Sequence, residues 1–173
     1  MRLAALPLLL APLFIAPVAV AATNLSVCTE ASPEGFDVVQ YNSLTTTNAS
    51  ADVLMNRLVE FDAASGKLVP SLADSWEVSP DGLTYTFKLH PDVKFHRTSY
   101  FSPSRTLTAE DVRFSFERML DPANPWRKIA QFGFPPPQSL HLPAVVKEID
   151  GLTPLTVRLT LDHSDSTFLH VLS

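Results

Sequence analysis

The sequence predicts a mixed α/β fold built from antiparallel hairpins and short helices. Two stretches, residues 75–95 and 145–161, alternate apolar and polar side chains around turn residues, which is typical of half-buried hairpins. Residues 108–120 carry apolar side chains at helical spacing behind a capping residue. The chain has 173 residues and 15 prolines, nearly twice the usual share of about 5%. This proline content favours loops and short elements over long helices.

Composition and charge exclude several classes of protein. Hydrophobic residues make up 46% of the chain and charged residues 18%, which excludes a disordered chain. The net charge of −5 lacks the positive potential that binds phosphate, so no nucleic-acid partner is expected. The single cysteine, Cys28, excludes a disulfide framework within the chain and a cysteine-rich zinc site.

The first 21 residues have the pattern of a secretory signal peptide. Arg2 is followed by an apolar run that ends in small residues, with cleavage expected after Ala21. Three prolines interrupt the run, which suits a signal better than a stable membrane helix. Acylation at Cys28 is disfavoured, because Val27 precedes it and the apolar run has already ended. We therefore expect an exported mature protein that does not span the membrane, because no later stretch has about 20 apolar residues.

Between residues 23 and 60 the local patterns predict one strand, one loop and one helix. Residues 23–29 alternate and predict a short strand. Residues 42–50 are mostly Asn, Ser and Thr and predict a polar loop. Apolar residues at helical spacing after Ser50, a plausible N-cap, predict a helix that runs to Glu60.

Residues 68–95 predict an extended segment and the first hairpin. The segment at 68–70 leaves a turn that contains Gly66. The hairpin turns at 79–82, where Gly82 can adopt a positive φ. The inward-facing side chains of its second strand are Leu83, Tyr85, Phe87 and Leu89.

Residues 108–173 predict a helix, an irregular stretch and a second hairpin. Thr108 is the expected N-cap, with Asp111 at the third helical position, and Pro122 follows the helix end. Residues 122–143 are expected to be irregular. The second hairpin is predicted to turn at Asp150-Gly151. Residues 168–173 resemble the start of an apolar helix without a stop signal, so we expect the chain to be cut inside an element.

No residue pattern predicts catalysis, a metal site or a cofactor. The five histidines include no pair at the i, i+4 spacing of a zinc helix. The carboxylates at 110, 111 and 117 fit the electrostatics of a helix start better than an acid–base pair. There is no glycine-rich phosphate loop and no nucleophile elbow. Trp76 and Trp126 suit ligand stacking, but packing in the core or between domains is the favoured interpretation.

Longer motifs resemble one family along essentially the whole mature chain, the peptide and nickel solute-binding proteins of ABC transporters (solute-binding family 5). The segments that carry the resemblance are LADSWE (72–77), DGLTYTF (81–87), VKFH (93–96) and LTAEDVRFSFER (107–118). Two further segments, VCTEASPEGFD (27–37) and NRLVEF (56–61), resemble the dipeptide-binding subgroup. His90-Pro91 departs from the family pattern, and so does the length, because family members are much longer.

The resemblance implies the N-terminal third of a two-lobed periplasmic binding protein. Residues 22–55 would then begin the first lobe, and residues 56–173 would form an incomplete small second domain. The opposite lobe, with most of the charged groups that meet the peptide termini, and any partner for Cys28 are expected beyond Ser173. The ligand-binding residues implied here, by position in the family, are Tyr41, Asn42, Ser43, Leu44 and Thr45.

The function implied by the resemblance is periplasmic binding of dipeptides or short peptides for uptake. Its partners would be a peptide ligand and the membrane permease, and the protein would be a monomer without cofactor or catalytic activity. Alternatives within the family are an antimicrobial peptide, haem or nickel as cargo. A non-functional fragment and, less favoured, an exported hydrolase are further alternatives. We expect the isolated chain to bind peptides poorly.

Overall fold

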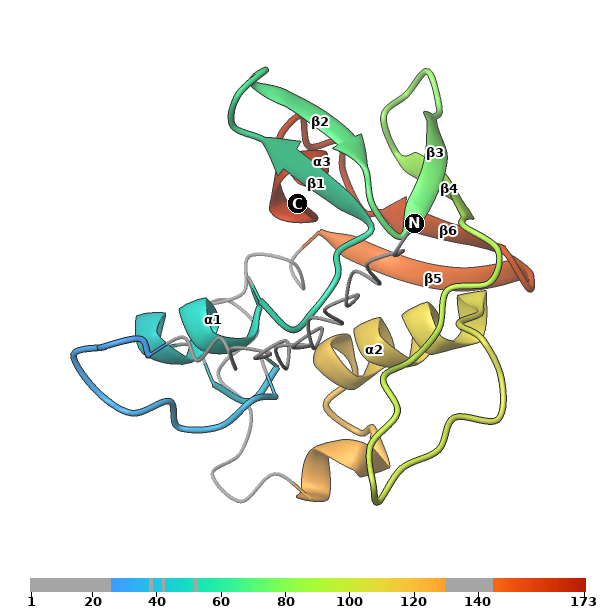
Figure 1. Cartoon of the computed structure of the whole chain (residues 1–173). Helices are drawn as coiled ribbons and strands as arrows, with labels where there is room; N and C mark the ends of the chain where they lie inside the picture. Colours follow the sequence, from blue (N-terminus) through green and yellow to red (C-terminus); the bar gives the residue numbers. More distant parts are fainter. Residues whose placement is uncertain (1–25, 38, 42, 52, 130–144) are drawn as a thin grey trace, which may run out of the picture.

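The computed structural model describes residues 26–37, 39–41, 43–51, 53–129 and 145–173, with the backbone alone at 129. The described elements are arranged as a sheet with helices and a second, smaller hairpin around it (Figure 1). In chain order they are α1 (Leu44–Ser50), β1 (Val59–Asp62), β2 (Lys67–Pro70), β3 (Ala73–Val78), β4 (Thr84–Leu89), α2 (Ala109–Leu120), a 3-10 helix (Pro125–Ile129), β5 (Val146–Thr153), β6 (Thr156–Leu161) and α3 (Phe168–Val171).

The main sheet has four antiparallel strands in the order β3-β4-β6-β5. It joins two hairpins that lie far apart in sequence, because β4 pairs with β6 and places Phe87 opposite Val157. Helix α2 packs along β5, while β1 and β2 form a separate pair beside α3 (Figure 1). The mixed fold with antiparallel hairpins and short helices is therefore confirmed.

The core follows the predicted alternation of the central strands. Phe87, Val157 and Leu159 are fully buried, and Tyr85 and Leu89 are nearly so. Each large apolar side chain that leaves water contributes about 1.5–3 kcal/mol. The two central strands therefore supply much of the stability that holds the sheet together.

The first hairpin turns where the sequence predicts. Gly82 has φ of +70°, a conformation that side chains disfavour. The carboxylate of Asp81 accepts hydrogen bonds from the Ser79 hydroxyl and from the Leu83 N–H, the latter at 3.0 Å. The Ser79 bond lowers the pKa of Asp81 below its usual value. The turn is thus fixed by its own side chains, as its composition indicates.

Helix α2 has the predicted start, end and buried face. It begins after Thr108, ends at Leu120 before Asp121-Pro122, and buries Val112 and Phe116 against the sheet. Trp76 also packs against the core, as favoured. Trp126 is different: it is 51% exposed and meets Phe114 edge-on, so it lies outside the core, and interdomain packing of this side chain stays a prediction.

The predicted loop at 42–50 and the predicted helix from Ser50 to Glu60 are both wrong. The helix is α1, Leu44–Ser50, so Ser50 is its last residue and Ser43 is its N-cap. The helix buries the hydroxyl residues Thr46 and Ser50, and both are hydrogen-bonded: the Ser50 hydroxyl donates to the Thr46 carbonyl, and the Thr46 hydroxyl accepts from the Glu34 N–H. The apolar residues that follow belong to a loop and then to β1, which begins at Val59.

The predicted strand at 23–29 is also wrong over its described part. Residues 26–29 are irregular and exposed, with Val27 72% accessible. Alternation alone does not form a strand, because the backbone needs a neighbouring ladder. Residues 23–25 lie outside the described residues, as do Ala21 and the proline-rich part of 122–143 from residue 130.

The second hairpin turns four residues later than predicted. Strand β5 runs through Asp150 and Gly151 to Thr153, and the turn is at Pro154-Leu155. Asp150 faces Arg158 across the pair and accepts a 2.7 Å hydrogen bond from its guanidinium. A Cβ at position 151 would lie 2.8 Å from Oε1 of Glu110, at the end of a flexible side chain that could shift to make room. Asp150 therefore serves strand pairing here, and Gly151 lies within the strand.

Candidate ligand-facing segment and its anchor

The predicted ligand-binding residues lie at the entry to α1. Tyr41 precedes the helix, Ser43 caps it, and Leu44 and Thr45 form its first turn. Asn42 lies outside the described residues. Leu44 is 73% exposed, and Thr45 and Tyr41 are half-buried. The described part of the segment therefore combines one exposed side chain, Leu44, with partly buried ones.

The Ser43 hydroxyl is committed to the structure of the helix. Its Oγ accepts a hydrogen bond from the Thr46 N–H at 3.3 Å and donates to the Thr46 hydroxyl at 3.0 Å. The Thr46 hydroxyl in turn accepts from the Glu34 N–H at 3.0 Å. Thr46 thus ties the preceding turn to the helix from a fully buried position. Leu44 and Thr45 are left as the outward-facing side chains of this turn.

Tyr41 is positioned by a glycine. A Cβ at Gly35 would lie 2.3 Å from Cε2 of the Tyr41 ring, closer than atoms can approach. The ring therefore lies directly against the Gly35 backbone. Because Gly35 has no Cβ, the Tyr41 ring can pack against the turn at this position.

An ion pair anchors this segment to α2. Both guanidinium nitrogens Nη1 and Nη2 of Arg118 donate to the Asp37 carboxylate, at 2.9 and 2.8 Å. Asp37 also accepts from the Gln40 side chain at 2.6 Å and from the Val39 N–H at 3.2 Å. The Asp37 side chain is 28% exposed and that of Arg118 is 19% exposed. A bidentate ion pair of this kind fixes the relative orientation of the two side chains as well as their distance.

The other end of α2 is held by Asp111. Its carboxylate accepts from the Thr108 N–H at 2.8 Å and from both terminal nitrogens of Arg105 at 2.6 and 2.7 Å. The Arg105 hydrogen bond, together with those of Thr108, lowers the pKa of Asp111 below its usual value. The predicted role of this acidic residue in starting the helix is confirmed.

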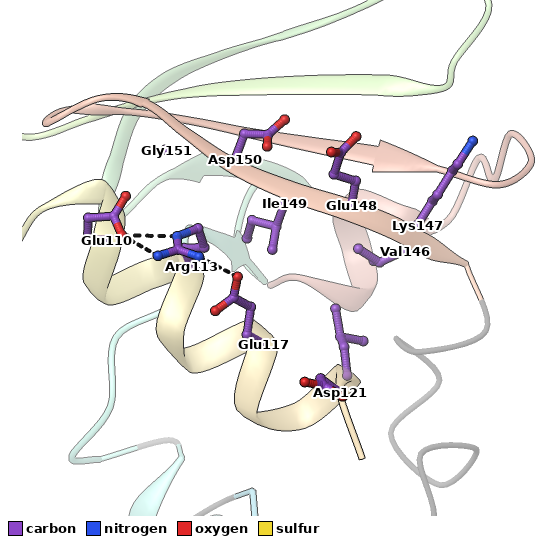
Figure 2. A pocket seen from close by; sticks show the side chains of 11 residues that line it. Glu110, Arg113, Glu117, Asp121, Val146, Lys147, Glu148, Ile149, Asp150 and Gly151 are labelled. Carbon is purple, nitrogen blue, oxygen red and sulfur yellow. Dashed lines mark hydrogen bonds and ion pairs between the residues drawn. The ribbon is translucent and has the colours of Figure 1, made fainter. Parts of the chain in front are cut away.

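A charged surface pocket of about 680 Å³ lies between α2 and β5 (Figure 2). On the helix, Arg113 is held between Glu110 and Glu117 by ion pairs of 2.6 and 2.5 Å. The Glu110 hydrogen bond, followed by that of Glu117, raises the pKa of Arg113. Glu148 and Lys147 project from β5 above them. Sequence patterns do not reveal this pocket, because only the packing of α2 on β5 brings its walls together.

Other candidate groups stand apart from one another. Cys28 is exposed and is a free thiol. Across the residues that the structure describes, no group of three or more His, Cys, Asp and Glu side chains is placed to hold a metal ion. Within the same ranges, no helix is both long and apolar enough to cross a membrane.

Comparison with known proteins identifies the family. The model of "Bacterial extracellular solute-binding proteins, family 5 Middle" matches residues 67–173, more than half of the chain. The chain belongs to this family. The match includes the main sheet and α2.

Individual members of this solute-binding family support the subgroup. The chain is 67% identical over 173 residues to a probable di/tripeptide-binding protein 5 of Pseudomonas aeruginosa, and the match covers all of this chain and 33% of the relative. It is 41% identical over 150 residues to the dipeptide-binding protein of Escherichia coli, covering 87% of this chain and 28% of that protein. The chain thus spans about a third of the length of the curated relatives it matches.

Solved structures give the same family fold. A dipeptide-binding protein from Pseudoalteromonas sp. SM9913 in complex with Met-Leu is 33% identical, with a TM-score of 0.77 over 84% of this chain and 29% of that one. HbpA2 from Haemophilus parasuis is 36% identical, with a TM-score of 0.77 over 82% of this chain and 28% of that one. The resemblance to part of a periplasmic binding protein is therefore confirmed.

Proposed function

We propose that this chain is part of an extracytoplasmic binding protein that captures dipeptides and tripeptides for uptake by an ABC transporter. The observation that carries the proposal is the 67% identity, over the whole chain, to a probable di/tripeptide-binding protein. Four further di/tripeptide-binding proteins of the same organism are 42–47% identical. The family consists of solute-binding proteins, so the proposed role is binding and delivery of a ligand rather than catalysis.

The contribution of this chain to the peptide site is the segment that enters α1. Tyr41, Asn42, Ser43, Leu44 and Thr45 would border the cleft, where the main chain can hydrogen-bond an extended peptide. Leu44 is exposed and lies on a segment whose position is fixed by Ser43, Thr46 and the Asp37–Arg118 pair. A rigid main chain suits recognition that is independent of the peptide's side chains.

The partners follow from the same role. The protein would be exported by residues 1–21, cleaved after Ala21, and act in the periplasm as a monomer that meets a membrane permease. Residues 22–55 would belong to the first lobe and residues 56–173 to the second domain. The ion pair between Asp37 and Arg118 would then fasten the beginning of one to a helix of the other.

Haem is the second candidate cargo. The chain is 42% identical over 142 residues to heme-binding protein A of Haemophilus influenzae. The identity is well below the 67% of the di/tripeptide relative, and the overlap covers 82% of this chain against 100%. Peptide therefore ranks first.

A chimera tests whether this chain can form its part of a peptide-binding site. The present chain replaces the matched third of the P. aeruginosa relative, and thermal shifts are recorded with Met-Leu, a tripeptide, haemin and nickel–histidine. We expect stabilisation by the two peptides, because a ligand that binds the folded state alone raises its stability. A folded chimera that is stabilised by haemin or by nickel–histidine, but not by either peptide, would overturn the proposal. The unaltered relative is the control for the assay.

A further inference from the structure

Within the described part of the chain, two buried side chains are polar, and both lie in α1. Thr46 and Ser50 are fully buried, whereas the other buried side chains there are aliphatic or aromatic. A hydroxyl group that leaves water loses hydrogen bonds unless the interior replaces them, so apolar residues are the common choice at such positions. The bonds that the two hydroxyls make therefore indicate what each of them does.

The two hydroxyls differ in what they connect. The Ser50 hydroxyl donates to the Thr46 carbonyl one turn earlier, so its bond stays within the helix. The Thr46 hydroxyl reaches outside the helix: it accepts from the Glu34 N–H and from the Ser43 hydroxyl, each at 3.0 Å. Thr46 therefore fixes the start of α1 relative to a turn that lies 12 residues earlier in the sequence.

The turn that Thr46 holds also supports the other side of the proposed ligand-facing segment, residues 41–45. Gly35, the neighbour of Glu34, lies directly against the Tyr41 ring. The same turn thus contacts the segment at its start, through Gly35, and just after its end, through Thr46. The main chain between these two contacts is held from both sides.

We infer that Thr46 is a positioning residue for the peptide site, an inference that rests on the proposed function. Its hydroxyl sets the distance between the turn at residue 34 and the first turn of α1, and it thereby fixes the main chain of residues 41–45 where a peptide would meet it. A binding site keeps its geometry only when the residues behind it are themselves locked by packing and hydrogen bonds. Thr46 acts from behind the segment and does not touch the ligand.

Removal of the Thr46 hydroxyl should displace the turn rather than unfold the helix. Glu34 is exposed, so its N–H can bond to water once the hydroxyl is absent. The Ser43 hydroxyl oxygen accepts from the N–H of residue 46 at 3.3 Å, a bond that does not use the Thr46 side chain, so the helix keeps its N-cap. The expected effect of Thr46→Val is therefore on ligand affinity more than on stability.

The Kd for Met-Leu, measured by calorimetry on the chimera and its variants, tests the inference. Circular dichroism first selects a temperature at which all variants are folded. Thr46→Val should weaken binding by about tenfold or more, whereas Thr46→Ser, which keeps the hydroxyl, should weaken it by less than about threefold. Ser50→Ala is the matched control, because it removes an equally buried hydroxyl from the same helix. It should lower the melting temperature but change the Kd by less than about twofold.

Three results would overturn the inference. The first is a folded Thr46→Val variant that binds Met-Leu as tightly as the wild-type chimera. The second is an equal loss of affinity in Thr46→Ser and Thr46→Val, which would show that the hydroxyl is not the group that matters. The third is an equal loss of affinity in Ser50→Ala and Thr46→Val, which would reduce the effect to the stability of the helix.

Hydrogen exchange separates this inference from the proposed function and needs no variant. In the wild-type chimera the Glu34 amide should exchange at least about tenfold more slowly than an unstructured amide, since it donates to a buried hydroxyl. Free exchange of that amide would overturn the inference even in a chimera that binds Met-Leu. A protected Glu34 amide in a chimera that binds haemin but no peptide would refute the proposed cargo alone, and the Thr46 variants are then compared with haemin.

Discussion

Arg118, near the end of α2, holds Asp37 through two hydrogen bonds of 2.8 and 2.9 Å across 81 residues of sequence. This ion pair fastens the segment before α1 to α2, the helix that packs on the main sheet. The orientation of Tyr41 and Ser43 relative to the rest of the chain therefore depends on it.

Asp37→Asn should lower the free energy of unfolding by about 1–2 kcal/mol, because it removes the charge from a partly buried, two-pronged pair. Urea denaturation followed by circular dichroism measures the change. Glu77→Gln is the control, since the Glu77–Lys88 pair is 3.5 Å long and both side chains are mostly exposed. Equal effects of the two substitutions would mean that the Asp37 pair has no special role.

Gly35→Ala should destabilise the chain by about 1–3 kcal/mol, because the added Cβ overlaps the Tyr41 ring. A double-mutant cycle separates this contact from a backbone effect. In the Tyr41→Ala background the same glycine substitution should cost little, since the ring is gone. An unchanged cost in that background would show that the glycine is needed for its own backbone conformation.

Asp111 should give the chain a measurable dependence on acid. Arg105 and Thr108 lower its pKa in the folded protein, so the folded state binds this proton less readily than the unfolded state. Its stabilising effect is therefore complete above the unfolded pKa, near about 4, and is lost as the pH falls through the folded value. Asp111→Asn should cost about 1 kcal/mol at neutral pH, and the difference from wild type should shrink towards pH 3.

Other carboxylates contribute to acid sensitivity as well. Three other aspartates, Asp62, Asp81 and Asp165, also have pKa values lowered by hydrogen bonds, from Ser65, Ser79 and Thr167 respectively. The wild type and the Asp111→Asn variant will therefore both lose stability in acid. The informative quantity is the difference in unfolding free energy between wild type and Asp111→Asn as a function of pH. A difference that stays constant from pH 7 to pH 3 would contradict the stabilising role of an ionised Asp111 at the start of α2.

Gly82→Ala should lower stability by about 1 kcal/mol, because position 82 has φ of +70° and the new Cβ would lie 3.2 Å from Cβ of Ser164. Gly82→Asn should cost less, since asparagine tolerates this region better than alanine. Thermal unfolding of both variants measures the order. Equal stability of the alanine variant and the wild type would contradict the left-handed turn.

The sheet and α2 could be predicted because their signals are local and apolar. In β4, side chains two apart face the core, so Tyr85, Phe87 and Leu89 reveal their burial directly in the sequence. Thr108 and Asp111 stand three apart and mark the start of α2 in the same way. The family motifs fall largely on these elements, which explains why the resemblance and the fold agree.

The remaining features depend on contacts that leave no local pattern. Helix α1 was missed because its buried residues, Thr46 and Ser50, are polar and are satisfied by hydrogen bonds. Asp150 and Gly151 suggested a turn, although both lie within β5, where Asp150 faces Arg158. No periodicity connects Asp37 with Arg118, so the anchor of the candidate site becomes visible only in the fold.

The affinity of the chimera for Met-Leu, measured by calorimetry beside that of the isolated chain, tests the central claim most directly. We predict a Kd in the micromolar range or tighter for the chimera and binding about a hundredfold or more weaker for the isolated chain, because two parts of the protein must enclose a peptide. A folded chimera without measurable dipeptide binding, alongside a relative that binds in the same assay, would contradict the assignment of this chain to peptide capture.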